Sequence, residues 1–252
     1  MTSGILRGVK VEKISSFEFK PGRVLAKKYK VVHRIGSGWE GEVYKLLEIE
    51  TGIERAGKFF FPHRNLKNST LRYHAKKLHK LRNCEILIQY NTQETITFKR
   101  QQIPILISEY VDGVMLSEFY TRQPKKRLDP YQALHLLLAL AKGVECIHSL
   151  KEFHGDIHTD NIIITRYGLS FGVKLIDFFH WKDATYENIL DDVCDLLQVY
   201  HESIGGVKIY SKLPKEIKQV VCGLKRSIIR KKYKTAGQLR VYLENLNFDS
   251  LI

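Results

Sequence analysis

HGDIHTDN, residues 154–161, is followed sixteen residues after Asn161 by Asp177, which closes a second apolar run. The apolar run after Asn161 and the one before Asp177 each predict a short strand, with a glycine-containing turn between them. If the strands pair antiparallel, the start of the first lies beside the end of the second. Asn161 and Asp177 would then be neighbours, with Asp156 just ahead of them. Oxygen ligands at one edge suit Mg²⁺, which usually binds one or two carboxylates plus substrate phosphates. The alternative is a polar loop beside an ordinary hairpin.

A glycine-rich segment lies far upstream in the chain. Residues 35–43 read IGSGWEGEV, a spacing in which small residues let backbone N–H groups approach phosphate oxygens closely. A dinucleotide-binding loop of this kind follows a strand and opens a helix, whereas here strand-forming residues lie on both sides. The segment therefore predicts a glycine-rich hairpin and argues against the dinucleotide-binding fold.

One lysine stands inside an apolar strand downstream of the hairpin. Residues 55–61 read RAGKFFF, with Lys58 among small and aromatic side chains. A charged group in such surroundings is costly unless it is paired or used. We therefore expect the charge of Lys58 to be paired or used, and a lysine that reaches solvent from a strand edge is the alternative.

The order of these segments resembles that of the protein-kinase-like superfamily: glycine-rich loop, strand lysine, hinge, aspartate-to-asparagine loop, and then an Asp-Phe pair at 177–178. The resemblance covers about residues 29–246. It implies a bilobal α+β fold. A small antiparallel-sheet N-lobe with one helix would occupy 29–112, and a mainly helical C-lobe 113–252. Residues 1–28 would be a basic N-terminal extension.

The same resemblance implies roles for individual residues. Lys58 would hold the α- and β-phosphates of ATP, and Asp156 would accept the hydroxyl proton or orient the nucleophile. Asn161 and Asp177 would hold Mg²⁺. His158 would donate to the phosphate or brace a neighbouring aspartate, and the sequence leaves both possibilities open. The residues implied around the nucleotide are Ile35, Gly36, Gly38, Gly41, Val43, Ala56, Lys58, Ser108, Glu109 and Val111.

The loop departs from the usual His-Arg-Asp pattern, because Gly155 replaces the arginine. In regulated kinases that arginine pairs with a phosphate on the activation loop, so we do not expect this form of phospho-switching. A His-Gly-Asp loop with His158 resembles those of aminoglycoside phosphotransferases, choline kinases and other atypical kinases.

A second departure concerns the partner of Lys58. A helix predicted at about 69–82 carries no acidic residue, and neither does the wider range 55–84. His74 falls on the apolar face of this helix, near the place where kinases carry a glutamate that pairs with the strand lysine. Either Asp177 and the phosphates of the nucleotide neutralise Lys58, or the chain is an impaired kinase.

The segment after Asp177 is short. Fourteen residues separate Asp177 from Asp192, no Ala-Pro-Glu motif lies between them, and Thr185 and Tyr186 are their only hydroxyl side chains. A helix that begins near Leu190 resembles kinase helix F, with Asp192 as the buried aspartate that braces the catalytic loop. We expect no long peptide-docking platform, which favours action on a folded partner, on the chain itself or on a small molecule.

The composition agrees with one catalytic unit. The 252 residues are 44% hydrophobic, enough for one large core or two small lobes. No apolar window is long enough to span a bilayer and residues 1–28 lack a signal-peptide core, so we expect a cytoplasmic protein without a transmembrane segment. The cysteines show no paired spacing and predict reduced thiols and no zinc site. They are Cys84, Cys146, Cys194 and Cys222.

Three further helices are predicted at 130–148, 214–230 and 236–246, the first with Asp129 as its N-cap. The formal net charge is +14, from 41 basic and 27 acidic residues, and basic side chains cluster at 64–82 and 225–234. An acidic partner is one explanation of these clusters, and a solvated basic face is the other. No nucleic-acid-binding motif accompanies them, so we do not expect a nucleic-acid partner.

These patterns together predict an ATP- and Mg²⁺-dependent phosphotransferase, a protein serine/threonine kinase of atypical type acting on a protein substrate or on itself. A small-molecule kinase of the aminoglycoside or choline type is the first alternative. A nucleotide-binding pseudokinase scaffold is the second, and a basic nucleic-acid-binding module is the third.

Overall fold

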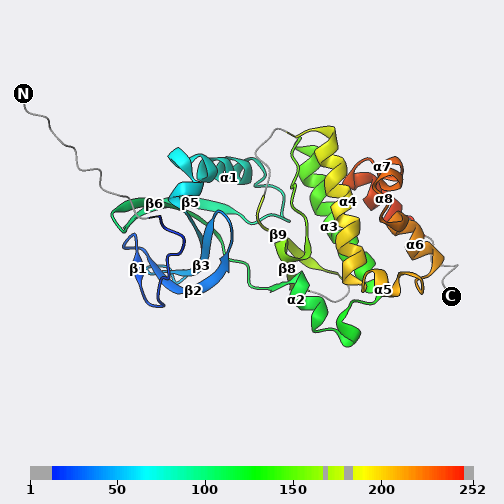
Figure 1. Ribbon diagram of the computed structural model, residues 1–252, viewed down its shortest axis with the longest axis horizontal. Helices are drawn as coiled ribbons and strands as arrows, with labels where there is room; N and C mark the ends of the chain where they lie inside the picture. Colours follow the sequence, from blue (N-terminus) through cyan, green and yellow to red (C-terminus); the bar gives the residue numbers. More distant parts are fainter. Residues whose placement is uncertain (1–12, 167–169, 179–183, 247–252) are drawn as a thin grey trace, which may run out of the picture. The chain divides into compact units, whose positions relative to one another are not determined.

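The computed structural model describes residues 13–166, 170–178 and 184–246 (Figure 1). The chain divides into two compact units. Unit 1 comprises residues 1–76 and 90–110, and unit 2 comprises residues 77–89 and 111–252.

Unit 1 is built on a six-stranded antiparallel sheet in the order β1-β2-β3-β4-β6-β5. The crossover from β4 to β5 contains helix α1, within which the boundary between the units falls. The elements are β1 (Val24–Leu25), β2 (Tyr29–Ser37), β3 (Gly41–Glu48), β4 (Glu54–Phe60), α1 (Ser69–Lys80), β5 (Tyr90–Phe98) and β6 (Gln101–Glu109).

The core of unit 1 follows from alternation along the strands, because successive side chains of a strand point to opposite faces. On β6, Ile103, Ile105 and Ile107 enter one cluster with aromatic side chains of β3 and β4, and all three are fully buried. Residues 13–28, which the sequence sets apart as an extension, also contribute to this cluster. Within it, the ring centroids of Phe19 and Phe59 lie 5.1 Å apart.

Unit 2 is mainly helical and contains a three-stranded sheet in the order β7-β8-β9 (Figure 1). Its strands are β7 (Val114–Met115), β8 (Ile162–Arg166) and β9 (Gly172–Leu175). Its helices are α2 (Leu116–Thr121), α3 (Pro130–Ser149), α4 (Tyr186–Ser203), α5 (Val207–Tyr210), α6 (Lys215–Val221), α7 (Arg226–Lys232) and α8 (Ala236–Glu244). The antiparallel sheet in the N-terminal part and the helices in the C-terminal part confirm the predicted α+β class.

Side-chain caps fix where two of the helices in unit 2 begin. The Asp129 carboxylate accepts the backbone N–H of Tyr131 at 2.9 Å, so α3 begins at the predicted residue. Helix α4 begins at Tyr186, before the predicted start near Leu190, because Thr185 and Asn188 form a capping box.

The predicted helix over 214–230 is wrong as a single element. The structure has α6 and α7 in its place, separated by a turn in which Cys222, Gly223 and Leu224 all have positive φ. A right-handed helix cannot continue through three such residues.

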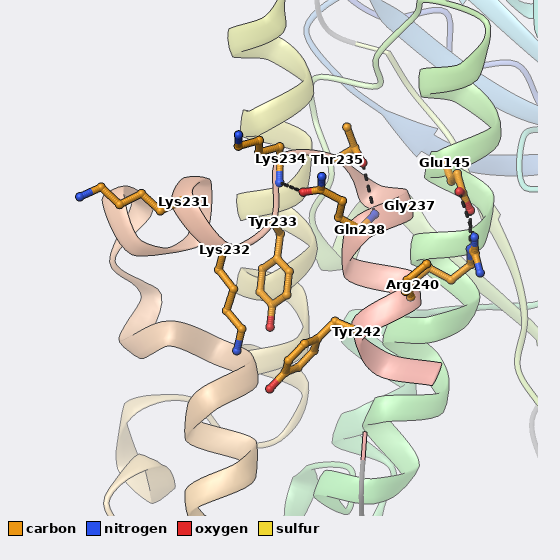
Figure 2. A pocket seen from close by; sticks show the side chains of 11 residues that line it. Glu145, Lys231, Lys232, Tyr233, Lys234, Thr235, Gly237, Gln238, Arg240 and Tyr242 are labelled. Carbon is orange, nitrogen blue, oxygen red and sulfur yellow. Dashed lines mark hydrogen bonds and ion pairs between the residues drawn. The ribbon is translucent and has the colours of Figure 1, made fainter. Parts of the chain in front are cut away.

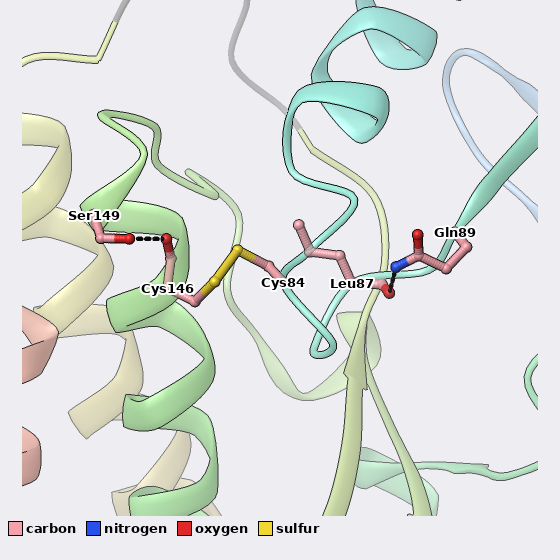
Figure 3. The surroundings of a disulfide bond; sticks show 5 residues. All are labelled: Cys84, Leu87, Gln89, Cys146 and Ser149. Carbon is pink, nitrogen blue, oxygen red and sulfur yellow. Dashed lines mark hydrogen bonds between the residues drawn. A yellow bond between two sulfur atoms is a disulfide. The ribbon is translucent and has the colours of Figure 1, made fainter.

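The expectation of reduced cysteines is wrong for two of the four. Cys84 and Cys146 form a disulfide within unit 2, and Cys146 lies on α3 (Figure 3). Their separation of 62 residues explains why the spacing along the chain gave no sign of the pair. In the described part of the chain, no helix combines the length and the apolar character that a membrane crossing requires.

Candidate active site

The glycine-rich segment forms the turn between β2 and β3, as predicted, and its tip is fastened to the end of β4. Gly38 N–H donates to the Gly41 carbonyl at 2.9 Å, and Phe61 N–H donates to the Glu40 carbonyl at 2.9 Å. Gly41 is required here for steric reasons, because a Cβ at this position would lie 1.9 Å from the Phe59 carbonyl oxygen. The backbone contacts bring the side chain of Glu40 beside β4.

Lys58 has an acidic partner, which the sequence analysis did not find. Its Nζ lies 2.8 Å from Glu40 Oε2, and His74 Nε2 lies 3.0 Å from the same oxygen. Lys58 is on β4, His74 is on α1, and Glu40 is in the glycine-rich turn. The carboxylate thus comes from the hairpin instead of the helix. An acidic residue directly before Gly41 was the available signal.

Lys58 and His74 together keep Glu40 ionised. Burial favours the neutral acid, but the hydrogen bond from His74 and the charge of Lys58 outweigh it and lower the pKa of Glu40 from 4.5 to about 2. The side chains of Glu40 and Lys58 are each 17% exposed, so solvent screens this pair less than an exposed one.

The other predicted nucleotide residues of unit 1 lie on neighbouring strands. Val43 is paired with Lys58 across β3 and β4, and Ala56 is paired with Ser108 across β4 and β6. Ser108 is buried, and Glu109 ends β6. Gly36 and Ile35 lie on β2, where Gly36 is opposite Val43. Val111 belongs to unit 2.

In unit 2, Asp192 braces the loop that precedes β8. This fully buried carboxylate accepts the backbone N–H groups of His154 and Gly155, both at 2.8 Å, and lies 3.0 Å from His148 Nε2. The predicted bracing role of Asp192 is confirmed. Since a helix side chain holds consecutive amides of the loop, the backbone just before Asp156 is fixed.

His154 holds Asp156 from the other side. Its Nδ1 accepts the Asp156 N–H at 3.3 Å, which requires the proton of a neutral ring to be on Nε2. Burial lowers the pKa of His154 to about 4, so the ring is neutral near pH 7.

Asn161 is tied to Asp156 and set beside Asp177. Its Nδ2 donates to the Asp156 backbone carbonyl at 2.9 Å and to Asp156 Oδ2 at 3.0 Å. Both partners only accept, so the amide oxygen must point elsewhere. Strands β8 and β9 pair antiparallel as predicted, and Ile176 N–H donates to the Asn161 carbonyl at 3.0 Å. Asp177 follows at once, in a left-handed conformation with φ 52°.

The residues of unit 2 fit a magnesium ion that also has phosphate ligands. The Asn161 amide oxygen and the Asp177 carboxylate are hard oxygen donors at adjacent positions of the β8–β9 hairpin. No group of three or more histidine, cysteine, aspartate or glutamate side chains gathers as a metal site within the described ranges. An ion here would therefore take further ligands from the substrate and from water.

The sequence left open whether His158 contacts the phosphate or braces an aspartate, and in the structure it lies beside Asp156 and Asp160. Its Nε2 is 3.6 Å from Asp156 Oδ2, and its Nδ1 accepts the Asp160 N–H at 3.3 Å. The histidine is 46% exposed, so the Asp156 contact is screened by water.

Lys77, near the end of α1, is a residue that the sequence analysis missed. Its ammonium lies 4.5 Å from the ring centroid of Phe153, 4.7 Å from that of Phe178 and 3.7 Å from Glu152 Oε2. Burial lowers the pKa of Lys77, while Glu152 opposes this shift. The side chain connects α1 to the aromatic residue that directly follows Asp177.

Ion pairs connect the start of α4 to α7. Arg230 contacts Asp191 Oδ1 at 2.6 Å and Glu187 Oε2 at 2.8 Å, and Arg226 also pairs with Asp191. Thr185 caps α4, so one of the two hydroxyl residues of the short segment has a structural role. Residues 179–183 of that segment lie outside the described residues.

A separate hollow of about 740 Å³ lies along α7 and α8 in unit 2 (Figure 2). Its basic side chains are Lys231, Lys232, Lys234 and Arg240. Arg240 is paired with Glu145 on α3, with Nε 2.6 Å from Oε2. None of the predicted catalytic, nucleotide or magnesium residues lines this hollow, so it is a different surface from the candidate active site.

Comparisons with known proteins agree with the motifs. The family described as "Protein kinase domain" matches residues 29–197. The chain is 28% identical over 151 residues to smooth muscle myosin light chain kinase of Gallus gallus, covering 60% of this chain and 8% of that protein. It is 28% identical over 155 residues to death-associated protein kinase 2 of Homo sapiens, and the match covers 60% of this chain and 40% of that protein. It is 24% identical over 180 residues to the inhibitor of nuclear factor kappa-B kinase subunit alpha of Gallus gallus, and the match covers 71% of this chain and 24% of that protein. The chain spans less than half the length of each of these relatives.

Proposed function

Because the chain belongs to the protein kinase domain family, we propose that it transfers the γ-phosphate of ATP to a protein hydroxyl in a Mg²⁺-dependent reaction. The protein is a serine/threonine kinase of atypical type, with His-Gly-Asp in its catalytic loop. Its substrate is another protein or the chain itself.

The observation that carries this proposal is the fixed relation of Asp156, Asn161 and Asp192. The Asn161 amide donates two hydrogen bonds to Asp156. Asp192 accepts the backbone N–H groups of His154 and Gly155, the two residues that precede Asp156. The proposed proton acceptor and one proposed metal ligand are therefore joined by hydrogen bonds, and Asp177 directly follows Ile176, whose N–H donates to the Asn161 carbonyl across the β8–β9 hairpin. Phosphoryl transfer needs mainly such positioning and charge neutralisation.

Each proposed role belongs to a residue at a defined place. Lys58 binds the α- and β-phosphates, and the turn of Gly36, Gly38 and Gly41 covers them. Asp156 accepts the hydroxyl proton of the substrate or orients that hydroxyl. Asn161 and Asp177 hold Mg²⁺, which neutralises charge on the phosphates when bound. His158 contributes to the position of Asp156, with its Nε2 3.6 Å from Asp156 Oδ2.

The nucleotide base would meet the β4–β6 side of unit 1. Ala56 and Ser108 are opposite each other there, and Glu109 ends β6. We propose that Ile35 and Val43 also contact the base or ribose, that the backbones of Glu109 and Val111 bind the adenine, and that Ser108 is the small residue behind it.

A pseudokinase is the weaker candidate. The missing helix acid was its support in the sequence, and the pairing of Lys58 with Glu40 removes that argument. A small-molecule kinase rests on the His-Gly-Asp loop and stays an outcome of the test below.

The test is transfer of labelled phosphate by purified protein with Mg²⁺, followed by identification of the labelled amino acid. We expect labelling of serine or threonine in the chain itself or in a basic generic protein. Asp177→Ala should lower the rate by about 10³-fold, because it removes a proposed ligand of the Mg²⁺ ion, whose charge stabilises the transition state. Glu118→Gln, at an exposed ion pair on α2, is the matched control and should keep the full rate.

Three results would contradict the proposal. Equal labelling by Asp177→Ala would assign the signal to a contaminant. Turnover of an aminoglycoside or amino alcohol without protein labelling would indicate a small-molecule kinase. Stabilisation by nucleotide without transfer under any divalent metal would indicate a pseudokinase.

A further inference from the structure

The geometry around Glu40 differs from the arrangement that the kinase resemblance implied. The carboxylate belongs to the glycine-rich turn, and one of its oxygens contacts both Lys58 at 2.8 Å and His74 at 3.0 Å. Helix α1 supplies a histidine at the position where a carboxylate was expected, and its sequence STLRYHAKKLHK contains no acid. The acid that pairs with Lys58 therefore comes from the hairpin, and the helix contributes a histidine to the same carboxylate.

The backbone keeps Glu40 at this place. Phe61 N–H donates to the Glu40 carbonyl, and the close approach of Gly41 to the Phe59 carbonyl leaves no room for a side chain. The side chain of His74 is 6% exposed, and its ring centroid lies 5.8 Å from that of Phe60. The donor that faces Glu40 from α1 is thus held by packing, and the acceptor is held by the strand register.

We propose that Glu40 is the positioning residue for Lys58, and that His74 couples α1 to the glycine-rich turn by donating Nε2–H to the same carboxylate. This rests on the proposed function, since Lys58 matters for phosphate binding. The negative charge fixes the ammonium of Lys58 where β4 presents it. His74 fixes the charge in turn, so movement of α1 or of the turn changes the position of Lys58.

A competing interpretation predicts that removing the Glu40 charge raises the activity. Glu40 could occupy the place of the nucleotide phosphates and inhibit the enzyme until ATP displaces it. Removal of the charge would then raise activity and strengthen ATP binding. A positioning residue requires that removal of the charge lower the rate.

The activity test uses an exchange of the charge. Glu40→Gln keeps the size of the side chain and should lower kcat by about 100-fold, with a smaller effect on the KM for ATP. The double variant Glu40→Gln/His74→Glu moves the carboxylate to α1 and should recover at least about tenfold of that loss, a non-additive result expected of groups in contact. Glu54→Gln removes an acid that pairs with Lys45 in the same sheet and should leave kcat unchanged.

A second readout does not need activity. An amine-reactive reagent such as acetic anhydride, followed by mass spectrometry, reports how strongly the Lys58 ammonium is protected. Glu40→Gln should increase labelling of Lys58 several-fold, and Glu54→Gln should not. If the wild-type chain transfers no phosphate, the proposed function fails, while the labelling still decides whether Glu40 holds Lys58.

The inference is overturned by any of three results. In the first, Glu40→Gln has at least a third of the wild-type rate, or a higher rate. In the second, Lys58 labelling is the same in wild type and Glu40→Gln. In the third, the double variant is folded by circular dichroism and stays as inactive as the single one.

Discussion

Glu40, a single residue next to a glycine, connects the strand lysine to helix α1. Its folded-state pKa of about 2 lies below the 4.5 of an unfolded chain, so the folded state favours the ionised form. The stability that results is fully present above about pH 4.5 and is lost as the pH falls toward 2. The shift corresponds to roughly 3 kcal/mol at neutral pH, as an upper value for a pair that is mostly buried.

We therefore predict that Glu40→Gln lowers the free energy of unfolding by about 2–3 kcal/mol at pH 6 and by clearly less at pH 3.5. Urea unfolding of wild type and variant across this range measures the difference. The matched variant Glu54→Gln changes an ion pair in which the glutamate is 48% exposed, and its effect should stay below about 1 kcal/mol at every pH. A difference for Glu40→Gln that is the same at both pH values would contradict the ionised pair.

The residues that sequence patterns identified share one property: their chemistry depends on local spacing. Asn161 and Asp177 could be placed together because two short apolar runs with a turn between them specify an antiparallel hairpin. The helix that contains Asp192 could be predicted from its apolar period, whereas the bracing role of Asp192 was implied by the resemblance to kinase helix F. Glu40 was missed because its contact with Lys58 depends on the register between two strands and on the direction of one side chain, which no periodicity specifies.

At the scale of elements, the sequence predicted the start of α3 from its cap but missed the capping box of α4, and it failed where the backbone leaves its usual regions. Helix α3 could be placed from Asp129 and Pro130. The break between α6 and α7 was missed because Cys222 and Leu224 adopt positive φ, which non-glycine residues rarely do. Gly223 between them was the signal available. The disulfide of Cys84 and Cys146 was missed because chain spacing carries no information on distant contacts.

Gly41 and Gly38 in the glycine-rich turn have different roles, and an alanine substitution at each position distinguishes these roles. A Cβ on Gly41 would lie 1.9 Å from the Phe59 carbonyl oxygen, whereas a Cβ on Gly38 would have nothing within 4 Å. We predict that Gly41→Ala costs about 1–3 kcal/mol of stability, because the β3–β4 pairing must shift. Gly38→Ala should change stability by less than about 0.5 kcal/mol.

Gly38→Ala should still weaken ATP binding, because its new methyl group occupies space that a close approach of backbone to phosphate requires. Thermal unfolding without nucleotide, together with titration with ATP and Mg²⁺, gives both quantities. Unchanged ATP affinity in Gly38→Ala would show that this glycine does not approach the phosphates. An unchanged melting temperature in Gly41→Ala would contradict the close contact with β4.

At the scale of the whole molecule, basic residues outnumber acidic ones and give a formal net charge of +14. Ion pairs use some of the basic side chains, as Arg226 and Arg230 do with Asp191. The hollow along α7 and α8 is lined by Lys231 and Lys234, which are exposed, and by Tyr242, while Tyr233 between the lysines is buried (Figure 2). A surface with clustered cations attracts acidic partners at low salt.

We predict that an acidic partner protein uses this hollow, so that charge reversal there weakens its recognition and leaves the chemistry intact. Lys231→Glu/Lys234→Glu should raise the KM for an acidic protein substrate such as casein by at least about fivefold, with kcat and the KM for ATP unchanged, because rim charges steer association. The wild-type KM should also rise with salt, since screening lengths shrink to about 8 Å at 0.15 M. Lys125→Glu/Lys126→Glu changes the net charge equally but touches no residue that lines the hollow, and it should have little effect. An equal rise of KM in both variants would mean that the overall charge of the chain acts on the substrate and that the hollow has no special part in binding.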